Sequence, residues 1–227
     1  MTYDFDFGAV LAYWPLLLEG VWTTLRLTFF STVLGILIGA FCAVVRTSGA
    51  VWARSIVSLY VEFIRNTPLL VQSYFLIFGI ASLGIRLPIL LGATIALTVN
   101  IGAYTTEIVR AGIESIHKGQ LEAAACLGLS RTQTYLHVII RPALERVYPA
   151  LSSQYVLLML ASSIVSSVGV GELFGMSNRI QSATFRNFEI FVVLGVIYLL
   201  LAVLVRATFA LLGFAMFPRR RKLGTPI

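Results

Sequence analysis

Five apolar stretches alternate with shorter polar ones along the chain, and each is long enough to cross a membrane as a helix. A transmembrane helix needs about 20 mainly apolar residues. The stretches cover roughly residues 23–45, 56–80, 90–108, 151–168 and 188–212. The pattern predicts an all-α integral membrane protein with five transmembrane helices, whose membrane domain covers residues 23–214.

The second stretch contains the polar residues Glu62, Arg65, Asn66, Thr67 and Pro68. Proline has no backbone N–H and disfavours helical geometry in the residue before it, so we expect a helix break here. The two charged residues, three positions apart, suit an ion pair on one helix face. Alternatively, the broken helix lines a substrate path, because charged groups at membrane depth face protein or water. Both interpretations remain open at this point.

Two other stretches carry small or polar residues at informative positions. Gly35 and Gly39 have the spacing that permits close helix packing, although two glycines without a special contact fit equally well. In the third stretch Asn100, Tyr104 and Glu107 make the second half polar. We expect that half to pack inside the bundle rather than against lipid.

The composition agrees with a membrane protein. The 227 residues are 58% hydrophobic and only 12% charged, with a mean hydropathy of +0.90. So few charges cannot cover the surface of a soluble domain. The net charge of +7 follows from basic loops on the cytoplasmic side rather than from a nucleic-acid surface.

The basic residues also predict the orientation. They concentrate in residues 46–54 and 110–146 and in a basic tail over residues 215–227, whereas residues 1–20 contain no Lys or Arg. We therefore expect residues 1–22 to form an outer segment, with the N-terminus outside and the C-terminus in the cytoplasm.

The metal-binding residue types are few and widely spaced. Cys42 lies in an apolar run and Cys126 in a polar one, so no disulfide is expected. His117 and His137 have no ligand spacing. The sequence predicts no metal site.

Residues 119–150 form the longest polar connection in the chain. A helix-forming run over residues 121–127 ends at Gly128, a residue type that closes helices in the left-handed conformation. Ser130 and Gln133 have the spacing of a capping box that starts a second helix. The pattern predicts two short helices with a tight bend, outside the membrane between the third and fourth spans.

This connection carries a family resemblance. Glu122-Ala123-Ala124 is followed by Gly128, preceded by Gly119-Gln120, and accompanied upstream by residues 67–72, which read TPLLVQ. The chain resembles the polar amino acid permeases of ATP-binding cassette (ABC) importers, of the histidine and glutamine type. The resemblance implies a type I ABC importer permease fold, in which an elbow at about residues 119–142 docks on a cytoplasmic ATPase as the coupling helix. The implied coupling residues are Gly119, Glu122, Ala123, Ala124 and Gly128.

The resemblance also implies partners in the bacterial inner membrane. An ABC ATPase dimer would bind ATP and Mg, because this chain has no GxxxxGK[ST] phosphate loop and binds no cofactor itself. A substrate-binding protein would deliver the substrate. An odd number of spans and no visible internal repeat favour a dimer with a second permease subunit.

Two positions depart from the family pattern. Arg141 stands where Pro is usual, and Pro142 follows it. Leu160 and Ala161 replace a Lys-Asp pair that many members carry in the fourth span. Importers of this type are built from one or two kinds of permease, and one of two kinds often lacks this pair. A heterodimer is therefore favoured over a homodimer.

Neutral hydrogen-bonding groups at membrane depth are the candidates for a substrate path. They are Thr67, Gln154, Tyr155, Ser162 and Ser163. The serine hydroxyls have an alternative role, because a hydroxyl in a helix also bonds the backbone of its own helix.

Other functions are less well supported. The main alternative is an ion-gradient-driven secondary carrier or channel for small polar solutes, which predicts a relay of intramembrane acids and internal repeats. Only Glu62 and Glu107 lie at suitable positions. An intramembrane enzyme is disfavoured, because neither HExxH nor GxSxG occurs.

Overall fold

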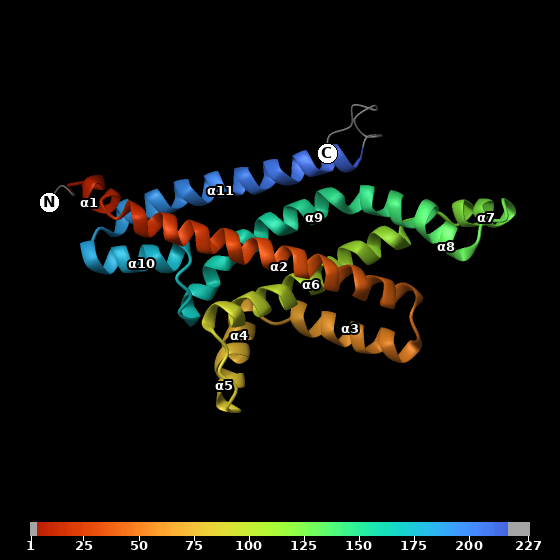
Figure 1. The fold of residues 1–227 in the computed structure, drawn as a ribbon, viewed down its shortest axis with the longest axis horizontal. Coiled ribbons are helices and arrows are strands. Elements are labelled where there is room, and N and C mark those ends of the chain that lie inside the picture. The colour runs from red at the N-terminus through yellow and green to blue at the C-terminus, as the bar shows by residue number, and fades with distance from the viewer. Residues whose placement is uncertain (1–3, 218–227) are drawn as a thin grey trace.

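The computed structural model describes residues 4–217, which form a bundle of helices without strands (Figure 1). Four helical segments of this part are long and apolar enough to cross a membrane. They are α2 (Trp14–Ser48), α6 (Ile89–Glu114), the segment Arg131–Val168, which contains α8 (Arg131–Gln133) and α9 (Arg141–Ala161), and α11 (Asn187–Met216). The predicted all-α membrane architecture is confirmed.

The second apolar stretch forms two main helices instead of one. It begins in α3 (Val51–Arg65) and continues in α4 (Leu69–Tyr74), a π-helical turn and α5 (Ile80–Ser82). Pro68, with φ −65° and ψ 137°, separates α3 from α4. The break follows from the missing proline N–H and from the restricted backbone of the residue before it. The predicted helix break is confirmed.

The charged residues before this break have partners other than each other. Arg65 lies 3.8 Å from the Glu107 carboxylate on α6, and Glu62 accepts a hydrogen bond of 3.1 Å from the Asn66 side chain. Within residues 4–217 no Glu62–Arg65 ion pair forms. The same-face ion pair considered for this stretch is therefore replaced by a contact between helices.

The most extensive helix pair is α2 with α6. A Cβ atom added to Gly39 would lie 2.5 Å from the Cβ of Thr105, and one added to Gly35 would overlap Ile101. Such distances are far below van der Waals contact, so both glycines allow the backbones to approach. Of the two interpretations of this glycine spacing, close packing is confirmed.

The bundle has two distinct ends (Figure 1). Helices α1 (Phe7–Leu11) and α10 (Leu173–Thr184) cover one end, here called the α10 end. Helices α7 (Lys118–Cys126) and α8 protrude from the other, the elbow end. Helix α2 begins at Trp14, earlier than the predicted start of the first span. Residues 218–227, with most of the predicted basic tail, lie outside the described residues.

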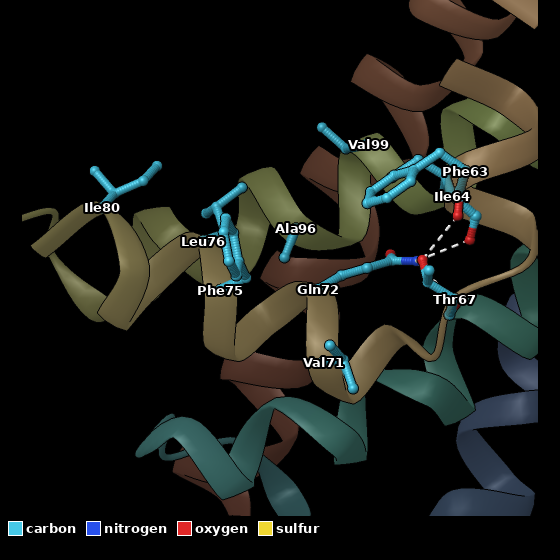
Figure 2. Close-up of a pocket in the computed structure, with 10 residues that line it drawn as sticks. All are labelled: Phe63, Ile64, Thr67, Val71, Gln72, Phe75, Leu76, Ile80, Ala96 and Val99. Carbon is cyan, nitrogen blue, oxygen red and sulfur yellow. Dashed lines mark hydrogen bonds between the residues drawn. The ribbon is translucent and has the colours of Figure 1, made fainter. Parts of the chain in front are cut away.

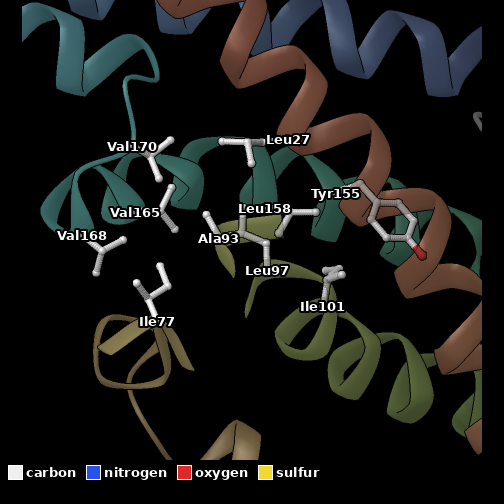
Figure 3. Close-up of a cluster of buried hydrophobic side chains, with 10 residues drawn as sticks. All are labelled: Leu27, Ile77, Ala93, Leu97, Ile101, Tyr155, Leu158, Val165, Val168 and Val170. Atoms are coloured by element: carbon white, nitrogen blue, oxygen red, sulfur yellow. The ribbon is translucent and has the colours of Figure 1, made fainter. Parts of the chain in front are cut away.

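Buried apolar side chains join the long helices between these ends. Figure 3 shows the main cluster, to which α2, α6 and α9 contribute Leu27, Leu97 and Tyr155. A second cluster lies near the α10 end and includes Leu17 and Ile190. Helix α11 is the least buried of the four long segments. Most of its surface is therefore left for lipid or for another chain.

A buried carboxylate fastens α10 to its neighbours. Glu172 is fully buried and accepts hydrogen bonds from two backbone N–H groups in the first turn of α10. It also accepts one of 2.9 Å from the Tyr198 hydroxyl on α11. Leu173 N–H donates to the Thr24 hydroxyl on α2 at 3.1 Å. Burial raises the pKa of the Glu172 carboxyl, although these donors oppose the shift.

Candidate functional site

The protruding elbow begins with a capped helix and ends it in a left-handed turn. His117 Nδ1 accepts a hydrogen bond of 3.2 Å from Gly119 N–H at the start of α7. At the other end, Gly128 has φ +71°, its N–H donates to Ala125 O, and Leu129 N–H donates to Ala124 O at 3.1 Å. This pair of bonds is the Schellman closure, which needs a residue that tolerates positive φ. The predicted left-handed helix closure at Gly128 is confirmed.

The second half of the elbow starts from the predicted capping box, but it is not the short helix that the sequence predicts, because the chain stays helical from Arg131 to Val168. The Ser130 hydroxyl accepts from Gln133 N–H at 3.3 Å, and the Gln133 side chain accepts from Ser130 N–H at 2.9 Å. Only Leu129 therefore separates the closing turn of α7 from the cap of α8. Backbone bonds on both sides leave the bend little freedom, so the elbow is a defined projection rather than a loose loop.

The predicted coupling residues lie together on this projection. Gly119, Glu122, Ala123 and Gly128 are exposed, whereas Ala124 is buried. The exposed alanine and glycine positions have little side chain to hold a partner at a distance. One face of α7 is thus open to another protein and the opposite face packs on the chain itself.

Side chains at the base of the elbow connect it to the bundle. Arg146 on α9 donates to Ser115 O at 2.7 Å and to the Ser115 hydroxyl at 2.6 Å. These bonds connect the two residues, which flank the elbow on opposite sides in the sequence. The hydroxyls of Tyr135 and Thr47 lie 3.5 Å apart and connect the elbow to the end of α2. The first contact thus joins α9 to the residue after α6 at the base of the elbow, and the second joins the elbow itself to α2.

A carboxylate at the elbow end of α6 gathers three arginines. Glu107 pairs with Arg46 from α2, with Arg110 at 2.8 Å, and with Arg65 from α3 at 3.8 Å. The Arg65 guanidinium also lies over the Tyr104 ring, 5.5 Å from its centroid. Glu107 thus connects three helices. The polar half of the third stretch faces protein, as predicted.

The break between α3 and α4 is repaired by one amide. Gln72 Nε2 donates to Ile64 O at 2.8 Å and to Thr67 O at 2.9 Å (Figure 2). In an unbroken helix, the N–H of residue 68 would bond Ile64 O, but Pro68 has none. Asn100 on α6 donates to Gln72 Oε1 at 2.9 Å and fixes its orientation. The amide pair therefore stabilises the break.

The same residues border a cavity of about 350 Å³ between α3, α4 and α6 (Figure 2). Its wall is mainly apolar, with Thr67 and Gln72 as the polar side chains. Both are already hydrogen-bonded to each other at 2.9 Å. This cavity suits an apolar group better than a charged one.

The predicted path residues do not gather in one cavity of the described chain. Thr67 borders the cavity in Figure 2, whereas Tyr155 is buried with its hydroxyl 3.2 Å from that of Thr105. Ser162 and Ser163 donate to carbonyls three residues earlier in their own helix. Gln154 is half-buried on α9. The alternative role of the serine hydroxyls is thus realised in this conformation.

Sequence analysis did not single out the Gln72–Asn100 pair as a site. Both residues stand in otherwise apolar stretches, and Gln72 follows Pro68 by one helical turn. That spacing is the signal that could have indicated a repair of the break. The partner on α6 required the structure.

The fold and the site together define a class of protein. It is a multi-helix membrane protein with an elbow that protrudes at one end. The family model of the binding-protein-dependent transport system inner membrane component matches residues 35–217. The chain belongs to this family, and it is a permease subunit of an ABC importer in the inner membrane.

Named relatives and solved structures agree with this assignment. The glutamine transport system permease protein GlnP of Escherichia coli K12 is 35% identical over 200 residues, covering 87% of this chain and 91% of that protein. The arginine transport system permease protein ArtQ of Bacillus subtilis is 30% identical over 205 residues, covering 88% and 92%. The crystal structure of an amino acid ABC transporter with histidines superposes with a TM-score of 0.86 at 34% identity, covering 94% of this chain and 100% of that chain. The MetNI methionine ABC transporter, with a TM-score of 0.73 at 24% identity and coverage of 88% and 96%, shares the fold.

Proposed function

We propose that this chain is the translocation subunit of an ATP-driven importer for polar amino acids. The observation that carries the proposal is the elbow, with its Schellman closure at Gly128 and its capping box at Ser130. A short rigid helix with an exposed small-residue face suits docking into the cleft of a partner. The names of the relatives, which include glutamine and arginine transport permeases, support amino acids as the substrate class.

The proposal includes three kinds of partner. An ABC ATPase dimer docks on the elbow and holds ATP and Mg, and a substrate-binding protein delivers the amino acid at the α10 end. The elbow end then faces the cytoplasm, with the N-terminus outside and the C-terminus inside. The basic loops of the elbow end support this orientation.

A second permease subunit completes the translocation path. A related but different subunit is favoured over a second copy, because Leu160 and Ala161 stand where many members of the family carry Lys-Asp. The largely uncovered α11 provides surface for such a subunit. Thr67, Gln154, Tyr155, Ser162 and Ser163 remain the proposed contributions of this chain to the path. A change of conformation would have to release the hydroxyls of the other four residues, all except Gln154, from their internal hydrogen bonds.

The test is to co-express the tagged chain with its ATPase and measure association and ATP-dependent uptake. Gly128→Pro, which forces φ to about −65° and removes a backbone donor, is expected to abolish both. Gly128→Asn is expected to retain them, because asparagine tolerates positive φ.

Gly84→Pro is the matched control. Gly84 also has positive φ (+88°) and an N–H donated to a carbonyl three residues earlier. It follows α5 by two residues, and α5 lies far from the elbow (Figure 1). Uptake should survive this change. Uptake that continues without ATP, or that survives Gly128→Pro, would contradict the proposed function.

A further inference from the structure

Among residues 4–217, Arg206 in the membrane-spanning helix α11 has no partner for its charge. It lies in α11, six residues before the predicted end of the fifth span at residue 212, or about 9 Å along the helix axis. Its side chain is exposed, and it forms no hydrogen bond or ion pair with any residue from 4 to 217. A guanidinium at this depth is costly unless an anion or water meets it. The described chain does not provide that anion.

A small polar pocket is lined in part by Arg206. It measures about 100 Å³ and lies between α9 and α11. Its lining residues are Tyr148, Pro149, Ser152 and Ser153 from α9 and Arg206 and Ala210 from α11. It differs from the apolar cavity in Figure 2, because most of its side chains carry hydrogen-bonding groups.

Two hydroxyls in this pocket are free to donate. Ser152 and Ser153 make no side-chain hydrogen bond within the described part of the chain. Ser162 and Ser163, further along the same segment, each bond a carbonyl of their own helix. The two pocket serines therefore depart from the usual behaviour of a helical hydroxyl.

The geometry of the pocket is fixed from its two sides. The Tyr148 hydroxyl donates to Phe209 O at 2.5 Å and ties α9 to α11 beside Arg206. The Phe209 ring stacks on Tyr155 of α9, with ring centroids 5.3 Å apart. These contacts set the spacing of α9 and α11 at the pocket before any ligand arrives.

The pocket opens on a face of α9 that the chain leaves uncovered. Ser153, Leu157 and Leu160 are all exposed and lie at the spacing of one helix face. A face that combines an unpaired serine with a neighbouring unpaired arginine does not suit lipid. It suits a water-containing path that is closed on its other side by the second permease.

We propose that Arg206, Ser152 and Ser153 form a subsite for the α-carboxylate of an amino acid in transit. The subsite rests on the proposed function and specifies how this chain contacts the substrate. A guanidinium presents a fork of donors that matches the two oxygens of a carboxylate. A volume of about 100 Å³ equals roughly three water molecules. It has room for a carboxylate, and the remainder of the amino acid would extend out of the open side of the pocket, so the subsite recognises the group that all amino acids share.

The test measures ligand binding by the detergent-purified permease–ATPase complex without the binding protein. The probes are L-glutamine, L-arginine and L-histidine, each compared with its α-carboxamide, which lacks the negative charge. We expect the wild-type complex to bind whichever of these amino acids has the highest affinity more tightly than it binds the α-carboxamide of that amino acid. Arg206→Gln should weaken binding of the acid about 10- to 100-fold and remove that preference. Arg206→Lys should restore part of it, and Ser153→Ala should lower affinity by less than Arg206→Gln.

Arg54→Gln is the matched control, because Arg54 is also exposed and its side chain has no partner among residues 4–217, but it lies on α3 away from the pocket. It should leave both affinities unchanged. A wild-type complex that binds acid and carboxamide equally would overturn the subsite. The subsite would also be overturned if the sole effect of Arg206→Gln were the loss of bound phosphatidylglycerol in native mass spectrometry. A sole effect on permease dimerisation would overturn it as well. A failure of the proposed function would give a different result from a failure of the subsite, because the wild-type chain would then not co-purify with an ATPase.

Discussion

Replacing Gln72 by leucine should destabilise the fold, because one amide completes the break between α3 and α4. Gln72 Nε2 donates to Ile64 O at 2.8 Å and Thr67 O at 2.9 Å, and its oxygen accepts from Asn100 at 2.9 Å. Ile64 O has no alternative donor in its own helix, because Pro68 occupies the position that would supply it. Leucine keeps the approximate size of the side chain and removes every one of these bonds.

The magnitude follows from the groups left without partners. A buried polar group without a hydrogen bond costs about 1–3 kcal/mol. The low end applies here, because Gln72 is half-buried rather than fully buried. Two carbonyls and the Asn100 amide at about 1 kcal/mol each give a loss of about 3 kcal/mol in the free energy of unfolding.

The assay is reversible unfolding of the purified chain in mixed micelles, followed by circular dichroism. Asn100→Leu removes only one of the bonds and should cost about a third as much. The double variant should cost less than the sum of the single ones, since the residues are in contact. Gln154→Leu is the matched control, because Gln154 is a half-buried glutamine that has no hydrogen bond within the described residues. If Gln72→Leu and Gln154→Leu shift the unfolding free energy equally, the repair of the break is refuted.

Three further predictions test the packing and the buried charges. Gly39→Val should cost about 1–3 kcal/mol through overpacking of α2 on α6, whereas Gly195→Val, in open space on α11, should cost much less in the same unfolding assay. Glu107→Gln should cost about 2–3 kcal/mol, which is somewhat below the cost for a fully buried ion pair because the Glu107 side chain is 18% exposed. Added salt should reduce this loss. An unchanged unfolding midpoint would contradict the role of this carboxylate. Since burial raises the pKa of Glu172 in the folded state, the native protein binds the proton more tightly than the unfolded chain. Thermal stability should therefore fall as pH rises from about 4.3 toward that raised pKa, and Glu172→Gln should flatten this slope while exposed Glu19→Gln leaves it intact.

The caps of the elbow could be predicted because their signals are local, whereas the length of its second helix, which continues to Val168, could not. Gly128 closes one helix, and Ser130 with Gln133 opens the next, all within a few residues of sequence. Such caps depend on backbone geometry and on side chains three positions apart. Distant parts of the chain hardly change them, so the sequence pattern and the structure agree.

The polar contacts inside the bundle could be predicted only in part. The polar half of α6 indicates that Asn100 and Glu107 face protein, but not which helix supplies their partners. The contacts with Gln72 and Arg46 join residues 28 and 61 positions apart, and helix packing alone selects them. The same reason explains Arg206. Its place in an apolar stretch is visible in the sequence, whereas its lack of a partner is a property of the packed bundle.

Contacts at the elbow end form a continuous connection from the elbow to the break in the second apolar stretch. Tyr135 of the elbow lies 3.5 Å from Thr47, hydroxyl to hydroxyl, and the preceding residue of α2, Arg46, pairs with Glu107 on α6. Glu107 in turn pairs with Arg65, the last residue of α3. Each contact joins a different pair of elements, so none follows from the geometry of a single helix. A partner that displaces the elbow therefore acts on α2 and on the end of α3 through adjacent side chains. If an ATPase docks on the elbow as proposed, the break, and not only the base of the elbow, lies within its reach.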